Sequence, residues 1–196
     1  MRHIKSSTCL AVVLSLYFSA FSYAQLASQE RIMEINFDTS QATQNWRAVN
    51  DGVMGGRSSG GPRFENGAMI FAGVVNTNGG GFSSVRTDVE AGVLNTASGI
   101  SLRVKSDGRT YKLTLRSDAR YRGRTVSFQA EIPQTPIGEW ADVTVPFDSL
   151  QGSIFGRRVR GARFDKSEVR ELGIIIADGQ DGPFKLEVDW VKDCSK

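Results

Sequence analysis

The sequence predicts an all-β protein, an antiparallel β-sandwich or jelly roll with at most one or two short helical turns. Three observations predict it. Short runs that alternate apolar and polar residues recur roughly every eight to fifteen residues, glycine-rich turns separate them, and no amphipathic helix of useful length occurs. Alternation with a period of two buries one face of each strand, so two such sheets must pack face to face.

Five segments carry this alternation: 32–37, 100–105, 111–116, 126–131 and 184–190. In the last of them the residues predicted to share the buried face are Phe184, Leu186, Val188 and Trp190. The run 172–177 is apolar on both sides and rich in isoleucine, which is typical of a central strand that is covered on both faces.

Turn signals separate the strands at Asn66-Gly67, at Asp107-Gly108 and along 178–183. The Asp107-Gly108 pair lies between two alternating runs, so it predicts a hairpin. One or two helical turns are expected over 165–171, where Asp165 stands three residues before a glutamate, as in a capping box.

The first 24 residues have the features of a secretory signal peptide: a basic start, a short apolar stretch and Ser22-Tyr23-Ala24. We expect cleavage after Ala24, a short frayed leader over 25–31, and one domain over 25–196 that is periplasmic or secreted. The apolar stretch is too short to span a bilayer comfortably, so no stable membrane anchor is expected after cleavage; an uncleaved anchor is the alternative.

Composition excludes several chemistries. Loss of Arg2 and Lys5 with the signal lowers the formal net charge from +3 to +1, which gives no electrostatic case for a nucleic-acid partner. The only histidine, His3, leaves as well, and this excludes Ser-His-Asp catalysis and histidine metal sites. Cys194 is then the one cysteine, so its thiol either pairs between chains or is inert.

Two glycine-rich runs are the most informative stretches: W-R-A-V-N-D-G-V-M-G-G-R-S-S-G at 46–60 and N-T-N-G-G-G-F-S-S-V-R at 76–86. Glycine reaches positive φ and lets another backbone or a ligand come close, so both runs predict shaped loops. After Arg47, which directly follows the tryptophan, Arg57 is the only basic residue in the first run, and no helix is predicted after the run. Both features argue against a phosphate-binding loop.

These runs, with S-D-G-R-T-Y-K-L at 106–113, L-G-I at 172–174 and G-P-F-K-L-E-V-D-W at 182–190, resemble the complex I intermediate-associated protein 30 family. The resemblance covers nearly the whole exported chain and departs from the family pattern at 154–158. It implies a galactose-binding-like β-sandwich and a role in assembling respiratory complex I. As an exported bacterial-type member, the chain could reach only the outward edge of that complex.

Eight residues are candidate binding residues: Trp46, Asn50, Asp51, Ser58, Asn78, Ser83, Arg157 and Arg158. The polar side chains of the first run are interpreted as facing a cleft shared with Asn78 and Ser83. The alternative is a loop whose polar groups bond one another and hold two sheet edges together. Val53 and Met54 are expected to fill the core.

The arginines of 157–163, with four more over 116–124, form the one local concentration of charge. They could bind an acidic partner, phospholipid headgroups or an anionic glycan; a solvated loop is the alternative. Trp46, Trp140 and Trp190 could form a platform for a sugar ring, although such residues more often lie in a core.

Asp178 and Asp181 could donate oxygens to calcium, but their loop does not match an EF-hand, and no metal site or cofactor is predicted. The sequence as a whole predicts a non-catalytic binding or assembly-factor module with a protein partner in the cell envelope. Two alternatives stay open: a carbohydrate-binding module, and a hydrolase that pairs Asp51 with Asp178 or Asp189.

Overall fold

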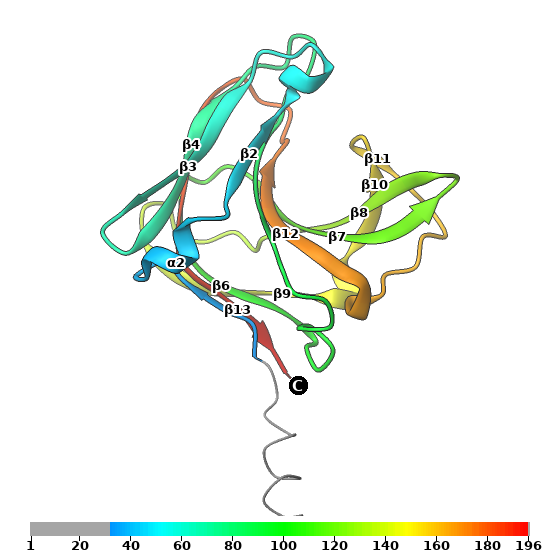
Figure 1. Cartoon of the computed structure of the whole chain (residues 1–196). Coiled ribbons are helices and arrows are strands. Elements are labelled where there is room, and N and C mark those ends of the chain that lie inside the picture. The colour runs from blue at the N-terminus through cyan, green and yellow to red at the C-terminus, as the bar shows by residue number, and fades with distance from the viewer. Residues whose placement is uncertain (1–31, 196) are drawn as a thin grey trace, which may run out of the picture. The chain divides into compact units, whose positions relative to one another are not determined.

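The computed structural model describes residues 32–195 (Figure 1). The expected signal peptide, 1–24, and leader, 25–31, lie outside the described residues. Within residues 32–195 no helix has the length and apolar character needed to cross a membrane. The described part of the chain consists of two antiparallel sheets joined by short turns and crossings.

Sheet A has six strands in the order β3-β4-β13-β6-β9, and β1 also pairs with β13. Its strands are β1 (Glu34–Asn36), β3 (Ser59–Glu65), β4 (Ala68–Val75), β6 (Gly99–Ser106), β9 (Trp140–Pro146) and β13 (Gly182–Cys194). The long β13 accommodates β4 along its first half and β1 along its second half on the same edge, opposite β6.

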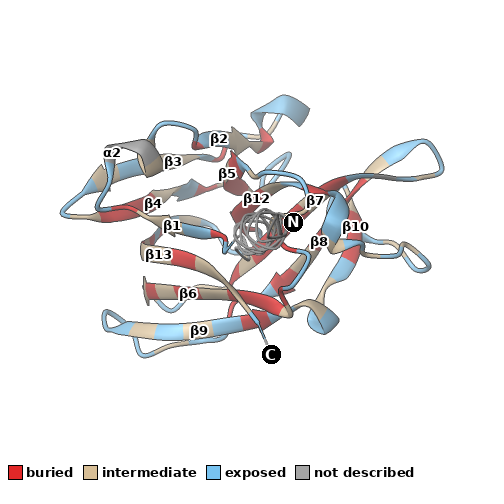
Figure 2. Ribbon diagram, turned by 60° about the horizontal axis from the view of Figure 1, so that its bottom comes forward, coloured by how far each residue is buried: buried red, intermediate tan, exposed pale blue. Residues whose placement is uncertain are grey.

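Sheet B has seven strands in the order β11-β10-β8-β7-β12-β5-β2. Its strands are β2 (Arg47–Asn50), β5 (Ser83–Asp88), β7 (Tyr111–Tyr121), β8 (Arg124–Glu131), β10 (Gln151–Ile154), β11 (Arg157–Arg158) and β12 (Val169–Ile176). Figure 2 shows buried residues on both layers where they face each other. The predicted antiparallel sandwich is therefore confirmed.

The core lies between the sheets and comes from the alternating positions that the sequence indicates. Leu102 of β6 and Leu113 of β7 are fully buried, and the ring of Phe71 packs on that of Phe184 with centroids 4.8 Å apart. Each such side chain contributes about 1.5–3 kcal/mol through burial. The run 172–176 is buried throughout and lies between β7 and β5, which confirms the predicted central strand.

Two-residue turns with positive φ at both positions close three hairpins. They are Asn66-Gly67 between β3 and β4, Arg122-Gly123 between β7 and β8, and Phe155-Gly156 between β10 and β11. This is the type I′ geometry, whose twist matches that of the paired strands. The Asn66-Gly67 prediction is confirmed.

The predicted hairpin at Asp107-Gly108 is wrong. This turn carries the chain from β6 in sheet A to β7 in sheet B, and the two strands do not pair. The Asp107 carboxylate accepts hydrogen bonds from the Arg109 N–H (3.0 Å), the Tyr111 hydroxyl (3.1 Å) and the Lys185 N–H (2.7 Å). The aspartate therefore stabilises a crossing between sheets rather than a tight hairpin.

The predicted burial of Trp190 is also wrong. A bulge between Val188 and Trp190 shifts the pairing of β13 with β6, so Val191 takes the next buried position. Trp190 is only partly buried, and the Lys192 ammonium lies 4.5 Å from its ring centroid.

Residues 32–195 contain four single helical turns, more than expected. They are α2 (Ser40–Thr43) and the 3-10 turns η1 (Asp51–Met54), η2 (Phe147–Ser149) and η3 (Lys166–Glu168). The turn η3 is the predicted one: the Asp165 carboxylate accepts a hydrogen bond from the Ser167 N–H at 2.9 Å and caps its start.

Candidate functional site

The two glycine-rich runs meet at one end of the sandwich. Asn50 at the end of β2 pairs with Ser83 at the start of β5, and Ser59 of β3 pairs with Val74 of β4. Because both loops leave these paired strands at the same end, 51–58 faces 76–82. We call this pair of segments the glycine loops.

The carboxylate of Asp51 joins the glycine loops. It is fully buried and accepts hydrogen bonds from the Ser58 hydroxyl (2.6 Å) and N–H (2.8 Å) on one loop. From the other loop it accepts the N–H groups of Gly81 (2.6 Å) and Phe82 (3.3 Å). Burial alone would raise the pKa of Asp51, but these four donors, the Ser58 hydroxyl foremost, hold the pKa below its usual value.

Two glycines leave room for this carboxylate. A Cβ atom on Gly56 or on Gly80 would overlap the side chain of Asp51 from opposite loops. The glycine content of both runs therefore follows in part from a buried carboxylate that needs close backbone approach on two sides.

The other polar residues of the glycine loops also bond one another. The Ser83 hydroxyl donates to Asn50 Oδ1 at 2.6 Å, and Asn50 Nδ2 donates to the Gly60 carbonyl at 3.0 Å. The Ser58 hydroxyl also accepts the Asn76 N–H at 3.0 Å. Four predicted site residues thus come together, but they face one another rather than a cleft, as in the alternative interpretation. Asn78 is exposed on the second of the glycine loops, 76–82.

The expectation that Val53 and Met54 fill the core is wrong. The side of η1 that faces inward is taken by Asp51, so the next residues of the turn point into solvent. Val53 is 76% exposed and Met54 is 52% exposed. Their backbone is nevertheless fixed, because the Gly56 N–H donates to the Asp51 carbonyl at 3.0 Å and Gly55 ends the turn at φ +89°.

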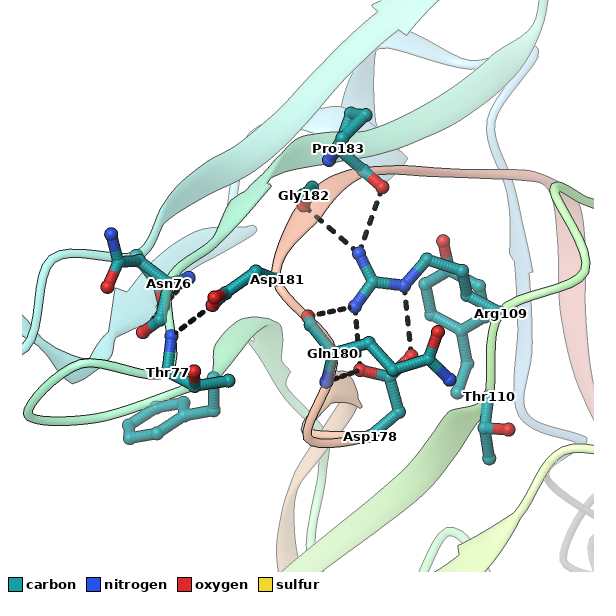
Figure 3. Close-up of polar contacts among 12 residues, drawn as sticks. Asn76, Thr77, Arg109, Thr110, Asp178, Gln180, Asp181, Gly182 and Pro183 are labelled. Atoms are coloured by element: carbon teal, nitrogen blue, oxygen red, sulfur yellow. Dashed lines mark hydrogen bonds and ion pairs between the residues drawn. The ribbon is translucent and has the colours of Figure 1, made fainter.

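Arg109 fixes the third loop at this end of the molecule, 178–183 (Figure 3). Its guanidinium binds both oxygens of the Asp178 carboxylate, at 2.9 and 2.7 Å. It also donates to the carbonyl oxygens of Gln180 (2.5 Å), Gly182 (3.0 Å) and Pro183 (2.9 Å). The hydrogen bonds to Asp178 raise the pKa of Arg109, and they hold the pKa of Asp178 down against the opposing effect of burial.

The same loop is linked to the second glycine run through Asp181, whose carboxylate accepts the Thr77 N–H at 2.6 Å (Figure 3). Asp178 and Asp181 therefore bind different partners, and a guanidinium occupies the place beside Asp178 that a calcium ion would need. Among residues 32–195 no group of three or more histidine, cysteine or acidic side chains is arranged to hold a metal.

The three carboxylates of the hydrolase alternative lie apart. Asp51 is enclosed by the glycine loops, and Asp178 is bound to Arg109. Asp189 lies on sheet A, 3.3 Å from the guanidinium of Arg103. Hydrolysis by two carboxylates requires both groups on one bond of a substrate, and these three provide no such pair.

The three tryptophans do not form one platform. Trp46 is buried against Phe37, with ring centroids 5.7 Å apart. Trp140 is 37% exposed on β9, under the ammonium of Lys105. Trp190 lies on β13 under Lys192, as described above. The aromatic sugar platform is therefore absent from these residues.

A cleft of 390 Å³ lies elsewhere, over β7, β8 and β10 of sheet B. It is lined by Lys112, Gln129, Ala130, Glu131, Ser149, Gln151, Gly152, Ser153, Gly156 and Arg158. Of the predicted binding residues only Arg158 reaches it; Arg157 is exposed beside it on β11. None of the lining residues is aromatic.

The roles of Arg109, the exposure of Val53 and Met54, and the cleft were not predicted from the sequence. The available signal for the cleft was the row of polar residues at alternate positions of β7 and β8, such as Lys112 and Gln129, which mark the outer face of sheet B. The signal for Arg109 was its place directly after the Asp107-Gly108 turn.

Solved structures with this fold include carbohydrate-binding modules of Clostridium thermocellum. The family 11 module in complex with a β-1,3-1,4-mixed-linked tetrasaccharide is 16% identical, with a TM-score of 0.61 over 83% of this chain and 96% of that one. The family 11 module of the cellulase Lic26A-Cel5E is 14% identical, with a TM-score of 0.63 over 84% and 95%. At such identity the likeness shows the fold alone, a galactose-binding-like β-sandwich.

Two curated relatives are complex I intermediate-associated proteins. The probable mitochondrial protein of Caenorhabditis briggsae is 25% identical over 185 residues, 83% of this chain and 54% of that protein. The mitochondrial protein of Mus musculus is 33% identical over 96 residues, 46% and 28% of the two. The chain thus spans about half or less of these relatives. The family model of complex I intermediate-associated protein 30 matches residues 35–188, and the chain belongs to this family.

Proposed function

We propose that the chain is a non-catalytic binding module of the assembly-factor kind, and that it holds a protein partner in the cell envelope through the glycine loops. Family membership supports the general role, because the relatives are associated by name with complex I intermediates. The partner, its link to complex I and the export of the chain are parts of the proposal.

One observation carries it. Val53 and Met54 stand exposed on a turn whose backbone is held by a buried carboxylate and by hydrogen bonds from both glycine loops. Apolar side chains on a rigid support bind a partner at a small cost in chain entropy, and methionine adapts its shape to the surface it meets. Exposure of the Val53 and Met54 side chains does not stabilise the fold.

The two buried carboxylates near the glycine loops are both engaged in holding loops. The Asp51 carboxylate, with a lowered pKa, is enclosed by four donors, so it neither reaches a substrate nor acts as a general acid near neutral pH. Asp178 is held in the same ionised state by Arg109. Both groups serve to position loops, which supports a binding role.

Partner capture from envelope extracts tests the proposal. The double variant Val53→Ser, Met54→Ser should fold normally, because both side chains are exposed, and should lose a partner that the wild type retains. Ile137→Ser is the matched control, because Ile137 is also exposed, at 72%, but lies outside the glycine loops. Complex I membrane subunits among the lost proteins would support the link to that complex.

Identical partner sets for the wild type and the double variant would contradict the proposal. So would equal losses in the double variant and in Ile137→Ser, because any exposed apolar residue would then have the same effect. Thermal melts of all three proteins must agree within a few degrees for the comparison to count.

A second candidate function, binding of a glycan, is supported by the cleft on sheet B. Its volume lies in the range of small-molecule sites, and amide, hydroxyl and charged groups line it. Binding of an oligosaccharide panel by calorimetry tests this candidate, with Gln129→Ala, Gln151→Ala as the variant. Tryptophan fluorescence would not report it, because no tryptophan lines the cleft. Absence of heat with every glycan, at concentrations up to millimolar, would remove it.

A further inference from the structure

Five arginines gather on two neighbouring hairpins of sheet B without acidic partners. They are Arg122 and Arg124 at the β7–β8 turn, and Arg157, Arg158 and Arg160 at and after the β10–β11 turn. All five are exposed, and no carboxylate of residues 32–195 lies within ion-pair distance of them. We call this region the arginine hairpins.

Elsewhere in the described residues most arginines have a carboxylate partner. Ion pairs of this kind are made by Arg47, Arg63, Arg86, Arg103, Arg109, Arg116 and Arg170. Among residues 32–195, most of the arginines that lack a carboxylate partner therefore lie at the arginine hairpins, although the chain expected after cleavage is nearly neutral.

The two hairpins lie side by side. Strands β8 and β10 pair up to Ser127 and Ser153, and the Arg124 guanidinium lies 5.4 Å from the centroid of the Phe155 ring. In Figure 1 and in Figure 2 both hairpins project on the same side of sheet B. Arg122 in turn lies 5.5 Å from the Tyr121 ring. Each hairpin end thus presents an aromatic ring next to guanidinium groups.

The turns of the two arginine hairpins place residues in backbone conformations that their side chains disfavour. A type I′ turn requires positive φ at both central residues and favours asparagine followed by glycine, as at Asn66-Gly67. At the arginine hairpins the first position is held by Arg122 (φ +50°) and by Phe155 (φ +48°). A long side chain in this left-handed region is strained, and a phenylalanine there is a clear outlier.

Phe155 brings no compensation from packing, because it is 71% exposed. Its ring contacts only the exposed Arg124 guanidinium among residues 32–195, and a contact of this kind in water contributes about 0.5–1 kcal/mol. The strained turn costs about 1–3 kcal/mol, so this contact does not offset it. Local rules are broken in this way mainly at functional positions. An exposed aromatic ring surrounded by unpaired arginines is suited to a surface that offers both anionic groups and an apolar layer.

We propose that the arginine hairpins dock the protein on the surface of a lipid bilayer with anionic headgroups. The guanidinium groups bind lipid phosphates, for which their planar fork is well matched, and the Phe155 ring enters the boundary between headgroups and acyl chains. Two projecting hairpin ends can reach a flat surface together. An acidic protein would supply the charge but needs a dedicated pocket for the ring, so the bilayer is the occupant that fits both features.

Vesicle co-sedimentation tests this docking with the protein purified in the form in which it exists in cells. Vesicles of phosphatidylcholine alone are compared with vesicles of equal parts phosphatidylcholine and phosphatidylglycerol. We expect partition to the anionic vesicles only, falling as salt is raised. The variant Arg157→Gln, Arg158→Gln should lower the partition coefficient by about thirtyfold at low salt.

Two further variants separate docking from folding and from overall charge. Arg63→Gln, Lys192→Gln removes the same charge from sheet A and should bind vesicles within about twofold of the wild type. Phe155→Asn restores the favoured turn sequence, so it should melt at the same or a higher temperature while binding anionic vesicles several-fold more weakly. Higher stability with lower binding is a result that a merely structural role for Phe155 does not give.

The proposal is overturned if the wild type ignores anionic vesicles at low salt, or if the two charge variants lose binding equally. It is also overturned if Phe155→Asn binds vesicles as well as the wild type does. Binding of soluble polyglutamate without any partition to vesicles would assign the arginine hairpins to an acidic protein instead.

Discussion

At the scale of single residues, the buried carboxylate of Asp51 determines the shape of the candidate site. It collects four donors from two loops that are separated by more than twenty residues in the chain, and two glycines give it room. Loss of one buried acceptor oxygen would leave N–H or O–H donors without a partner, and buried donors without partners lower the stability of the folded state.

The substitution Asp51→Asn keeps the size of the side chain and replaces one acceptor oxygen with a donor. We expect it to lower the free energy of unfolding by about 2–4 kcal/mol. Urea unfolding followed by circular dichroism measures this. Asp148→Asn, an exposed aspartate in η2, is the matched control and should change stability by less than about 0.5 kcal/mol. Equal effects of the two would show that the Asp51 contacts contribute little.

The stability of the protein should also depend on pH through Asp51. Its pKa is lower in the folded state than in the unfolded state, so its contribution is present above about pH 4 and is lost as pH falls through the folded pKa. Protonated Asp51 resembles asparagine. The difference in stability between the wild type and Asp51→Asn should therefore shrink from pH 7 to pH 3, and a constant difference would argue against this assignment.

At the scale of elements, close pairing of the strands relies on specific glycines. A Cβ on Gly173, in the central strand β12, would lie 2.5 Å from the Val85 carbonyl oxygen of β5. We expect Gly173→Ala to cost roughly 2 kcal/mol, because backbone must move. Gly52 has open space around its Cβ position, so Gly52→Ala should be neutral or stabilise by up to about 1 kcal/mol. Thermal melts compare the two, and the opposite order would contradict the packing of β12 on β5.

The strands could be predicted from the sequence, because burial on one face imposes an alternation that is visible in the chain. The partners of the strands could not. Asp107-Gly108 has the residues of a hairpin turn, but the strand that follows it, β7, belongs to the other sheet. The Asp107 carboxylate stabilises this crossing by accepting a hydrogen bond from the Tyr111 hydroxyl. The alternation of 184–190 predicts a buried Trp190. This prediction is wrong because a bulge in β13 changes the face of every residue that follows it.

The candidate site shows the same limit. Glycine density and the polar residues Asn50, Asp51, Ser58 and Ser83 indicated two shaped loops, and the structure brings these residues together. Their exposure could not be predicted, because it depends on contacts between residues thirty positions apart. Val53 and Met54 were assigned to the core by type alone, whereas Asp51 takes the inner side of their turn.

At the scale of the whole molecule, the proposed role requires export. The basic start, the apolar stretch and Ser22-Tyr23-Ala24 indicate cleavage after Ala24. Intact mass measurement of the protein purified from the cell envelope should give a chain that begins at Gln25. A mass that includes residues 1–24, or recovery of the protein from the cytoplasm alone, would contradict the proposed location and the envelope partner with it.

In the proposed function, the glycine loops contact a protein partner through their exposed apolar turn. Site-specific photo-cross-linking in living cells tests it most directly, with a photoreactive amino acid at Met54 and, as control, at Ile137, which is also exposed but lies outside the glycine loops. We expect a discrete cross-linked band from position 54 that is absent from position 137. No band at position 54, or the same bands from both positions, would contradict it.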